Sequence, residues 1–179
     1  LMQVLIKVGF PIYFIEWMKI LLNDQESCVA NAGTSTPYFR LQRGARQGDP
    51  ISAYLFIIAL EVLFELIKKD VRIKPLDILN HTFLYSAYAD DATFFLKDLE
   101  SVECLVNVLK DFYKFSDLRP NYDKCEIAGI GASKGALGAL WGMTSVDLTK
   151  QCVKILGIYF SYNKELMNGK FSIVTVEKI

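Results

Sequence analysis

Apolar residues recur at helical spacing in several stretches of the chain. In the third of these stretches, Leu55, Phe56, Ala59, Leu63 and Ile67 share one face, while charged residues fall on the opposite face. Gly9, the Asp49-Pro50 pair and the segment 117–120 are typical of helix ends. The pattern therefore predicts helices over residues 1–8, 12–23, 50–69 and 101–116.

Other stretches are rich in aromatic and β-branched residues and are bounded by turn residues. They predict a hairpin whose strands, 26–33 and 36–44, meet around Gly33-Thr34-Ser35, and a second, tight hairpin of strands 82–89 and 92–97. Residues 153–162 indicate a strand pair or a strand with a kink, after a Gly-rich, loop-like region at 129–142. Helices and hairpins in this order predict an α+β domain with an antiparallel sheet.

The composition is typical of an ordered globular protein. Of 179 residues, 52% are hydrophobic, and 20 basic residues balance 20 acidic ones, so one domain or most of one is expected. The longest uncharged runs, such as 51–60, are shorter than the ~18 residues of a membrane span, and we expect no membrane association. The chain starts within an apolar pattern and shows no signal peptide, which indicates a fragment of a longer protein. The four separated cysteines indicate reduced thiols in an intracellular protein.

Two adjacent aspartates, Asp90 and Asp91, lie within the apolar stretch FLYSAYADDATFFL. On a strand, neighbouring side chains point to opposite faces, but at a hairpin tip both carboxylates can line one edge. A divalent cation would offset their repulsion, and hard oxygen ligands suit Mg²⁺ or Mn²⁺ and two-metal phosphoryl transfer. An ordinary polar turn remains the alternative, because Asp is common in turns.

A second segment, RGARQGDPIS at 43–52, opens the third predicted helix. Gly44 and Gly48 let the backbone approach a ligand, Gln47 offers an amide to a base or sugar, and the helix start favours an anion. An ordinary glycine loop before a capped helix is the alternative. Three arginines at positions 40, 43 and 46 make one edge basic, unless they are simply solvated surface residues.

Together these segments resemble a known family. GARQGDPISAYLF, FLYSAYADDATFFL, SDLRPNYDKCE and VKILGIYF occur in the order found in reverse transcriptases of non-LTR (LINE-type) retrotransposons, and the resemblance covers essentially the whole chain. It implies the palm of a right-hand polymerase, with an antiparallel sheet packed on helices. Residues 1–179 would form a partial reverse transcriptase domain, the palm with a little of the fingers. The first palm strand, most of the fingers and the thumb would lie outside the chain.

The resemblance also implies roles for individual residues. Asp90 and Asp91 would bind Mg²⁺ (or Mn²⁺), with Asp90 the more direct ligand and Asp91 nearer the primer end. Lys124 would be a candidate proton donor to pyrophosphate, with a surface lysine as the alternative. The residues expected to position the template base and nucleotide are Arg46, Gln47, Gly48, Pro50 and Ser52. Those expected at the primer are Tyr88, Ala89, Leu156 and Gly157.

The function implied is RNA-directed DNA polymerisation, in which a primer 3′-hydroxyl attacks a deoxynucleotide. The implied partners are an RNA template, a DNA primer, deoxynucleotides and the rest of the retrotransposon polyprotein, in the nucleus and cytoplasm. Asp117 stands where many relatives have glycine, and the family's first palm aspartate has no counterpart here, so we expect this chain alone to be inactive. The alternatives are a non-catalytic remnant that is structural or binds nucleic acid, and a different Mg²⁺ enzyme such as a phosphatase or nuclease.

Overall fold

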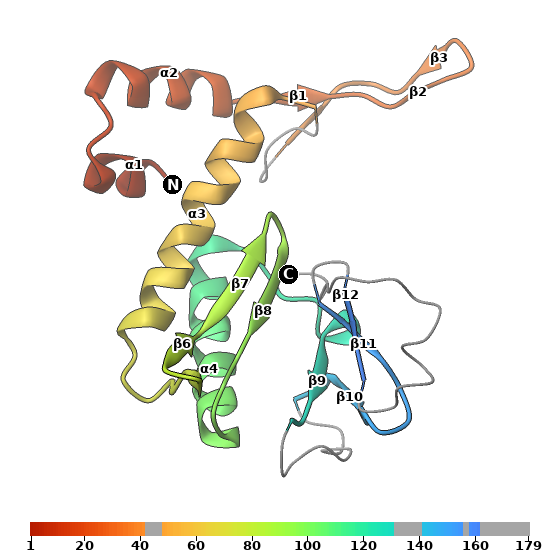
Figure 1. Cartoon of the computed structure of the whole chain (residues 1–179). Coiled ribbons are helices and arrows are strands. Elements are labelled where there is room, and N and C mark those ends of the chain that lie inside the picture. Colours follow the sequence, from red (N-terminus) through yellow and green to blue (C-terminus); the bar gives the residue numbers. More distant parts are fainter. Residues whose placement is uncertain (42–47, 131–140, 156–157, 162–179) are drawn as a thin grey trace. The chain divides into compact units, whose positions relative to one another are not determined.

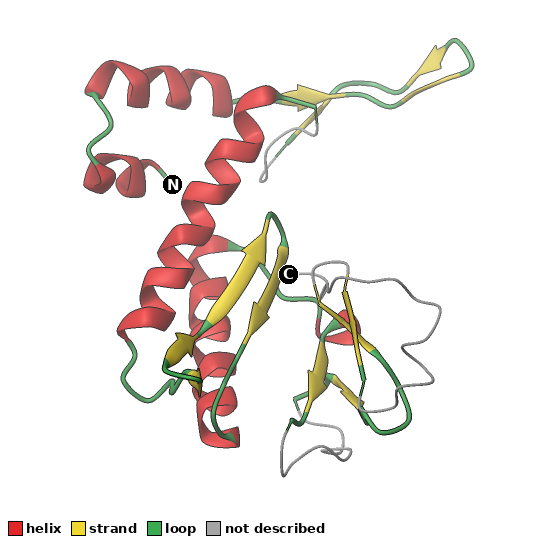
Figure 2. Cartoon of the chain, viewed as in Figure 1, coloured by secondary structure: helices red, strands yellow, loops and turns green. Residues whose placement is uncertain are grey.

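The computed structural model describes residues 1–41, 48–130, 141–155 and 158–161. It divides the chain into two compact units, Leu1–Phe64 and Glu65–Ile179. Helices and short paired strands alternate in both (Figures 1 and 2), which confirms the mixed α+β class. Arg43, Gly44, Arg46 and Gln47 of the glycine loop, and Leu156 and Gly157, lie outside the described residues.

The first unit begins with two helices, α1 (Met2–Val8) and α2 (Ile12–Leu22). Helix α1 ends at Gly9, which has a φ of 94°, as the sequence predicts. A core of four buried side chains holds both helices against the first turns of the next helix, α3 (Pro50–Lys69). These side chains are Leu5, Ile15, Met18 and Leu55.

A hairpin connects α2 to α3 in the predicted place, but its turn lies at Ala32-Gly33 instead of around Gly33-Thr34-Ser35, because Thr34 and Ser35 pair with Asn31 and Ala30. Strand β1 (Glu26–Ser27) pairs with β4 (Phe39–Arg40), and farther out β2 (Ala30–Asn31) pairs with β3 (Thr34–Ser35). The turn residues Ala32 and Gly33 both have positive φ, which a tight two-residue hairpin requires. The hairpin forms a narrow arm in Figure 1.

Helix α3 occupies the residues predicted for it and ends in the second unit. Among the described helices, it alone is long and apolar enough to cross a membrane, a test that core helices of soluble proteins also pass. The expected lack of membrane association therefore stays a prediction.

The second unit contains paired strands and helix α4 (Leu99–Ser116). The antiparallel pairs are β5 (Leu76–Ile78) with β6 (His81–Phe83), β7 (Tyr85–Tyr88) with β8 (Asp91–Phe94), and β11 (Val153–Ile155) with β12 (Ile158–Phe160). A short 3-10 helix, η1 (Tyr122–Lys124), precedes β9 (Glu126–Ala128), which pairs in parallel with β10 (Thr144–Val146).

Three details of the second unit differ from the prediction. The described strands form separate two-stranded pairs instead of one sheet, and one of these pairs is parallel. The predicted strand 82–89 is divided, because His81–Phe83 pairs with β5 whereas Tyr85–Tyr88 pairs with β8. Helix α4 starts at Leu99 instead of Ser101, because the Asp98 side chain accepts a hydrogen bond from the Ser101 amide and caps the helix.

Candidate active site

The adjacent aspartates occupy the tip of the β7–β8 hairpin, where the sequence predicts them. Tyr88 pairs with Asp91, so Ala89 and Asp90 form a two-residue turn. Ala89 has a φ of 52°, a left-handed conformation that costs a residue other than glycine about 1 kcal/mol. The turn is therefore held by the ladder below it, in which Ala87 pairs with Ala92.

The two carboxylates have different surroundings. Asp90 is exposed at the second turn position, whereas Asp91 is half-buried as the first residue of β8, with its Oδ1 atom shielded from solvent. Adjacent carboxylates at one tip can share a hard cation, with Asp90 open to water and Asp91 fixed by the strand. The described residues contain no cluster of three or more potential metal ligands. The turn thus places two neighbouring carboxylate residues at the tip of the hairpin.

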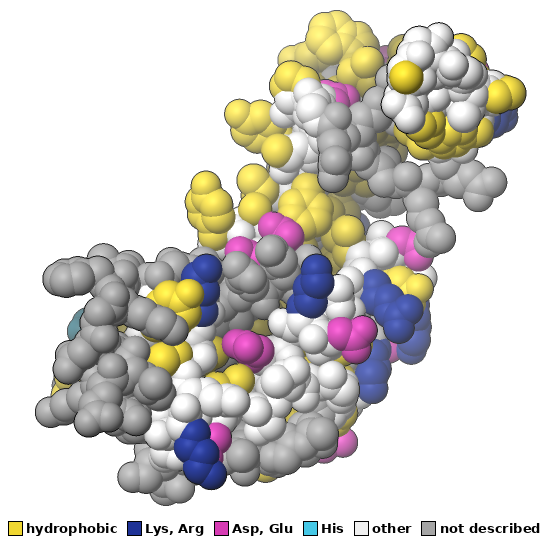
Figure 3. Space-filling model, turned by 90° about the vertical axis from the view of Figure 1, so that its right-hand side faces the viewer, with side chains coloured by type: hydrophobic (Ala, Val, Ile, Leu, Met, Phe, Trp, Pro, Cys, Tyr) yellow, Lys and Arg dark blue, Asp and Glu magenta, His cyan; other side chains and the backbone are white. Residues whose placement is uncertain are grey.

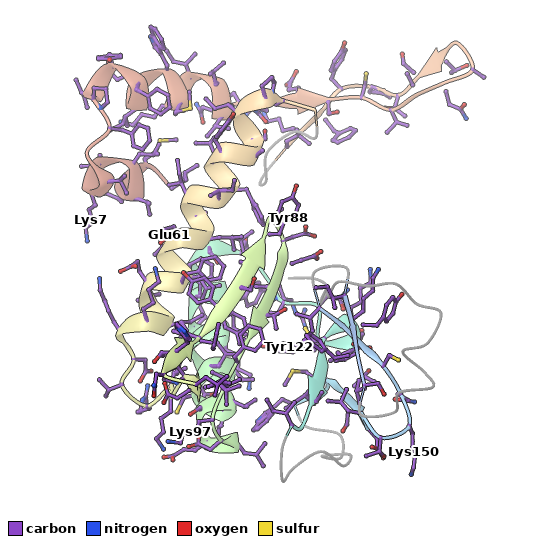
Figure 4. The ribbon with its side chains drawn as sticks, in the orientation of Figure 1. Lys7, Glu61, Tyr88, Lys97, Tyr122 and Lys150 are labelled. Carbon is purple, nitrogen blue, oxygen red and sulfur yellow. The ribbon has the colours of Figure 1, made fainter. Side chains whose placement is uncertain are left out.

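Tyr88 lies beside this pair. Cross-strand partners in an antiparallel hairpin project from the same face, so Tyr88 and Asp91 are neighbours on that face. Tyr88 is 76% exposed, and Figure 4 shows it at the tip of the hairpin. Its ring is therefore available to a ligand that approaches the acidic turn.

The start of helix α3 carries the described part of the glycine loop. Gly48 has a φ of 89°, which favours glycine. The Asp49 carboxylate accepts a hydrogen bond from the Ile51 amide at 3.0 Å, and Pro50 is the first helical residue. This confirms the predicted cap, and it places the aspartate's own negative charge at the helix end that favours anions.

Ser52 adds an unused polar group to that helix start. Its Oγ atom is buried and has no hydrogen-bond partner among the described residues. The structure thus brings Gly48, Pro50 and Ser52 together in the first unit, and Tyr88, Ala89, Asp90 and Asp91 in the second. The predicted contributions of Arg46 and Gln47 lie outside the described residues.

Lys124 lies on the exposed surface of η1. Its ammonium group takes part in none of the ion pairs recorded between described residues. No recorded ion pair between described residues joins Lys124 to the acidic turn. Its proton transfer therefore stays a prediction, and so does the surface-lysine alternative. The other late residues of the predicted site, Leu156 and Gly157, are outside the described ranges.

A cavity of about 510 Å³ runs along β8 within the second unit, lined mainly by apolar residues of β8, α4 and β9. Thr93, which is 6% exposed, and Tyr122 line it, and their hydroxyl groups have no partner among the described residues. Figure 4 shows Tyr122 between β8 and β9. Burial raises the pKa of Tyr122 and the pKa of the Cys125 thiol. Asp90 and Asp91 do not line this cavity, so the candidate site is the open hairpin tip.

Sequence reasoning misses a polar cluster at the other end of the hairpin. Ser101 is fully buried, and its Oγ atom donates to Asp98 Oδ1 at 2.7 Å and accepts from the Lys74 amide at 3.0 Å. The Lys74 carbonyl accepts from the Lys97 amide at 3.1 Å, just beyond β8. Figure 4 places Lys97 at the end of the hairpin opposite Tyr88. This cluster therefore ties the base of the hairpin to helix α4.

Charge strengthens the same cluster. The Lys74 ammonium group lies 3.1 Å from carboxylate oxygens of both Asp98 and Glu100. Hydrogen bonds from Ser101 and Lys74 hold the pKa of Asp98 down at about 2. Glu100 and Asp98 raise the pKa of Lys74 in turn. The sequence signal for this cap is an Asp three residues before a Ser at the start of an apolar periodic stretch.

Comparison with known proteins identifies relatives of the chain. Residues 1–160 match the model of the family described as reverse transcriptase (RNA-dependent DNA polymerase). The Drosophila melanogaster "Retrovirus-related Pol polyprotein from type-2 retrotransposable element R2DM" is 26% identical over 68% of this chain and 11% of its own length. The Xenopus laevis "Transposon TX1 uncharacterized 149 kDa protein" is 26% identical over 91% of this chain and 12% of its own length.

The chain thus spans about a tenth of the length of these curated relatives. The family match includes both the acidic hairpin tip and the start of helix α3. It confirms the resemblance on which the sequence interpretation depends, and the chain belongs to the reverse transcriptase (RNA-dependent DNA polymerase) family.

Proposed function

We propose that this chain is part of an intracellular RNA-directed DNA polymerase encoded by a non-LTR retrotransposon. The observation that carries the proposal is the pair of carboxylates at the tip of the β7–β8 hairpin, within the segment that matches the reverse transcriptase family. The reaction is attack of a DNA primer 3′-hydroxyl on the α-phosphate of a deoxynucleotide, with pyrophosphate as the leaving group. An RNA strand serves as template and supplies the sequence specificity by base pairing.

Asp90 and Asp91 are the proposed ligands of Mg²⁺, or of Mn²⁺, which prefers similar oxygen donors. The exposure of Asp90 supports its role as the more direct ligand, and Asp91, the first residue of β8, would lie nearer the primer end, as the family resemblance implies. When bound, the metal would favour deprotonation of the primer hydroxyl and offset charge on the triphosphate. The protein's part is to hold two carboxylates at one hairpin tip, where Asp90 is exposed to water and substrate.

Tyr88 and Ala89 are the proposed primer contacts. The exposed Tyr88 ring offers a flat apolar surface to a sugar or base, and it projects from the same hairpin face as Asp91. Ala89 has a small side chain in the turn itself, so the backbone there can come close to the primer. These two residues would hold the 3′ end beside the carboxylates.

The remaining site residues keep the roles that the family resemblance implies. The loop and helix start would position the template base and incoming nucleotide through Arg46, Gln47, Gly48, Pro50 and Ser52. Leu156 and Gly157 would contact the primer, and Lys124 would donate a proton to pyrophosphate.

The proposal includes a third carboxylate from another part of the longer polypeptide. Two-metal transfer requires oxygen ligands beyond the two at this turn. The 179-residue chain alone is therefore expected not to extend a primer, whereas the longer polypeptide should do so.

The experiment is Mg²⁺-dependent extension of a labelled DNA primer on an RNA template by the longer polypeptide. Extension that needs both the template and the complementary deoxynucleotides supports the proposal. Phosphate release from simple esters without template or deoxynucleotides would instead indicate a phosphatase. Extension by the purified 179-residue chain would contradict the need for a third carboxylate.

A further inference from the structure

Three hairpins between described strands turn through two residues. The first of these residues is Ala32 in the β2–β3 hairpin, Leu79 in the β5–β6 hairpin and Ala89 in the β7–β8 hairpin. All three have a positive φ, of 47°, 49° and 52° respectively. Glycine adopts this conformation freely, whereas the Cβ atom of any other residue crowds the neighbouring carbonyl oxygen. Each turn is therefore held in place by the strands that it joins.

The turn at the acidic tip differs from the other two in its second residue. Gly33 and Asn80 also have positive φ, and both are residue types that suit this conformation. Two positive φ angles in succession are the pattern of a type I′ turn, which two-residue hairpins commonly use. At the acidic tip φ is positive at Ala89 but not at Asp90, which is the pattern of a type II′ turn. That turn favours glycine at its first position, so Ala89 stands where glycine is expected.

The strand after the turn explains why the conformation of the alanine persists. Ala92 and Thr93 of β8 are 9% and 6% exposed, and they pair with Ala87 and Ser86. A shift of this pairing by one residue would turn the buried side chains to the opposite face, so the register of the hairpin is fixed. The turn cannot relax without loss of this packing. Strained backbone that persists in this way is concentrated at functional sites, where it fixes the geometry of reactive groups.

A fixed turn matters for the two carboxylates that follow it. On the face drawn in Figure 3, acidic side chains are scattered among other types, so an exposed carboxylate is by itself ordinary. Asp90 and Asp91 differ because they directly follow Ala89, and the backbone of the turn determines how one carboxylate lies relative to the other. The methyl group of Ala89 excludes most of the backbone conformations that are open to glycine. It therefore limits the relative positions of the two carboxylates before any ligand binds.

We propose that Ala89 is a positioning residue, whose methyl group restricts the turn so that the Asp90 and Asp91 carboxylates are held ready for one divalent cation. Ligands that are already in place lose less conformational freedom when a cation binds, so the cation binds more tightly. This role adds to the primer contact proposed for Ala89, because it acts without any primer. The inference rests on the proposed function in taking both aspartates as metal ligands.

The experiment measures Mn²⁺ binding to the longer polypeptide in the absence of primer, template and nucleotide. Free Mn²⁺ is measured by electron paramagnetic resonance, and the binding that is lost in Asp90→Asn is assigned to the hairpin tip. Ala89→Gly removes the methyl group, and Ala89→Ser keeps a Cβ atom at the same position. Leu79→Gly is the matched control, because Leu79 is the 89% exposed first residue of the β5–β6 turn and has a similar φ. Thermal melts followed by circular dichroism check that each variant folds.

We expect Ala89→Gly to bind Mn²⁺ at the tip about two- to fivefold more weakly than the parent, because a glycine must lose more conformational freedom. Leu79→Gly and Ala89→Ser should bind it with the parental affinity. Parental or tighter binding by Ala89→Gly would overturn the inference, and so would equal weakening in Leu79→Gly or Ala89→Ser. A residue with a purely structural role would change the melting temperature and leave the Mn²⁺ affinity unchanged.

Failure of the proposed function would give a different result. If Asp90→Asn bound Mn²⁺ as the parent does, the metal role of the aspartates would be wrong, and the inference would be wrong with it. If Asp90→Asn lost a site while Ala89→Gly kept the parental affinity, the inference alone would be wrong. The binding measurement does not depend on primer extension, so the two results are read separately.

Discussion

Replacement of Ser101 by alanine tests the cluster that ties the hairpin base to helix α4. The hydroxyl is fully buried and connects two chain segments, because it accepts from the Lys74 amide and donates to the Asp98 carboxylate. Alanine removes these hydrogen bonds, together with the 3.3 Å contact of the hydroxyl with the Arg72 carbonyl, and leaves the Lys74 amide without its acceptor. The Asp98 cap on the Ser101 amide, at 2.9 Å, survives the change.

The magnitude follows from these contacts. A buried donor left without a partner costs about 1–3 kcal/mol, and the better helix propensity of alanine returns a few tenths. We therefore expect Ser101→Ala to lower the free energy of unfolding by about 1–2 kcal/mol. For a chain of this size the melting temperature should fall by about 2–8 °C.

Urea and thermal unfolding followed by circular dichroism measure this change. Ser35→Ala is the matched control, because Ser35 is exposed on strand β3, and its stability should stay within about 0.5 kcal/mol of the parent. If Ser101→Ala were as stable as Ser35→Ala, the buried hydroxyl would not hold the two segments together and the reasoning would be wrong.

Two further predictions concern the ends of helix α4. The pKa of Asp98 is held at about 2, so the stability that its carboxylate contributes is present above its ordinary pKa of 3.8 and is lost as the pH falls toward 2. Asp98→Asn should therefore lose less stability than the parent between pH 5 and pH 2, measured by urea titration. Parallel pH curves for the two proteins would contradict this. Asp117, the C-cap, has a φ of 60°, so Asp117→Gly should raise the free energy of unfolding by about 0.5–1 kcal/mol, and a less stable variant would show that the aspartate side chain outweighs its backbone strain.

Periodicity predicts the helices and both hairpins because each depends on neighbours in sequence. The tip of β7–β8 follows from an acidic pair between two apolar strands, and the cap at Asp49 follows from Asp-Pro before a periodic stretch. These features are local, and the structure confirms them.

Two features of the second unit are not predicted. The short hairpin of β5 and β6 turns at Leu79-Asn80, which both have positive φ, and only the tolerance of asparagine for that conformation signals it. At Leu84 the chain changes partner strand, because Phe83 pairs with β5, whereas the Leu84 carbonyl accepts from the Phe95 amide next to β8. Which strand a segment pairs with depends on the fold of the whole unit, and a local sequence pattern does not specify it.

The central claim is that the carboxylates at the hairpin tip are required for nucleotidyl transfer as ligands of the metal. The most direct measurement is RNA-templated primer extension by the longer polypeptide with Asp90→Asn, compared with Asp77→Asn. Asp77 is an exposed aspartate on β5 that accepts a hydrogen bond from Thr82, a role that asparagine can keep. We expect Asp90→Asn to abolish extension while circular dichroism and the melting temperature stay unchanged, and Asp77→Asn to extend primers at the parental rate. Extension by Asp90→Asn near the parental rate would contradict the claim.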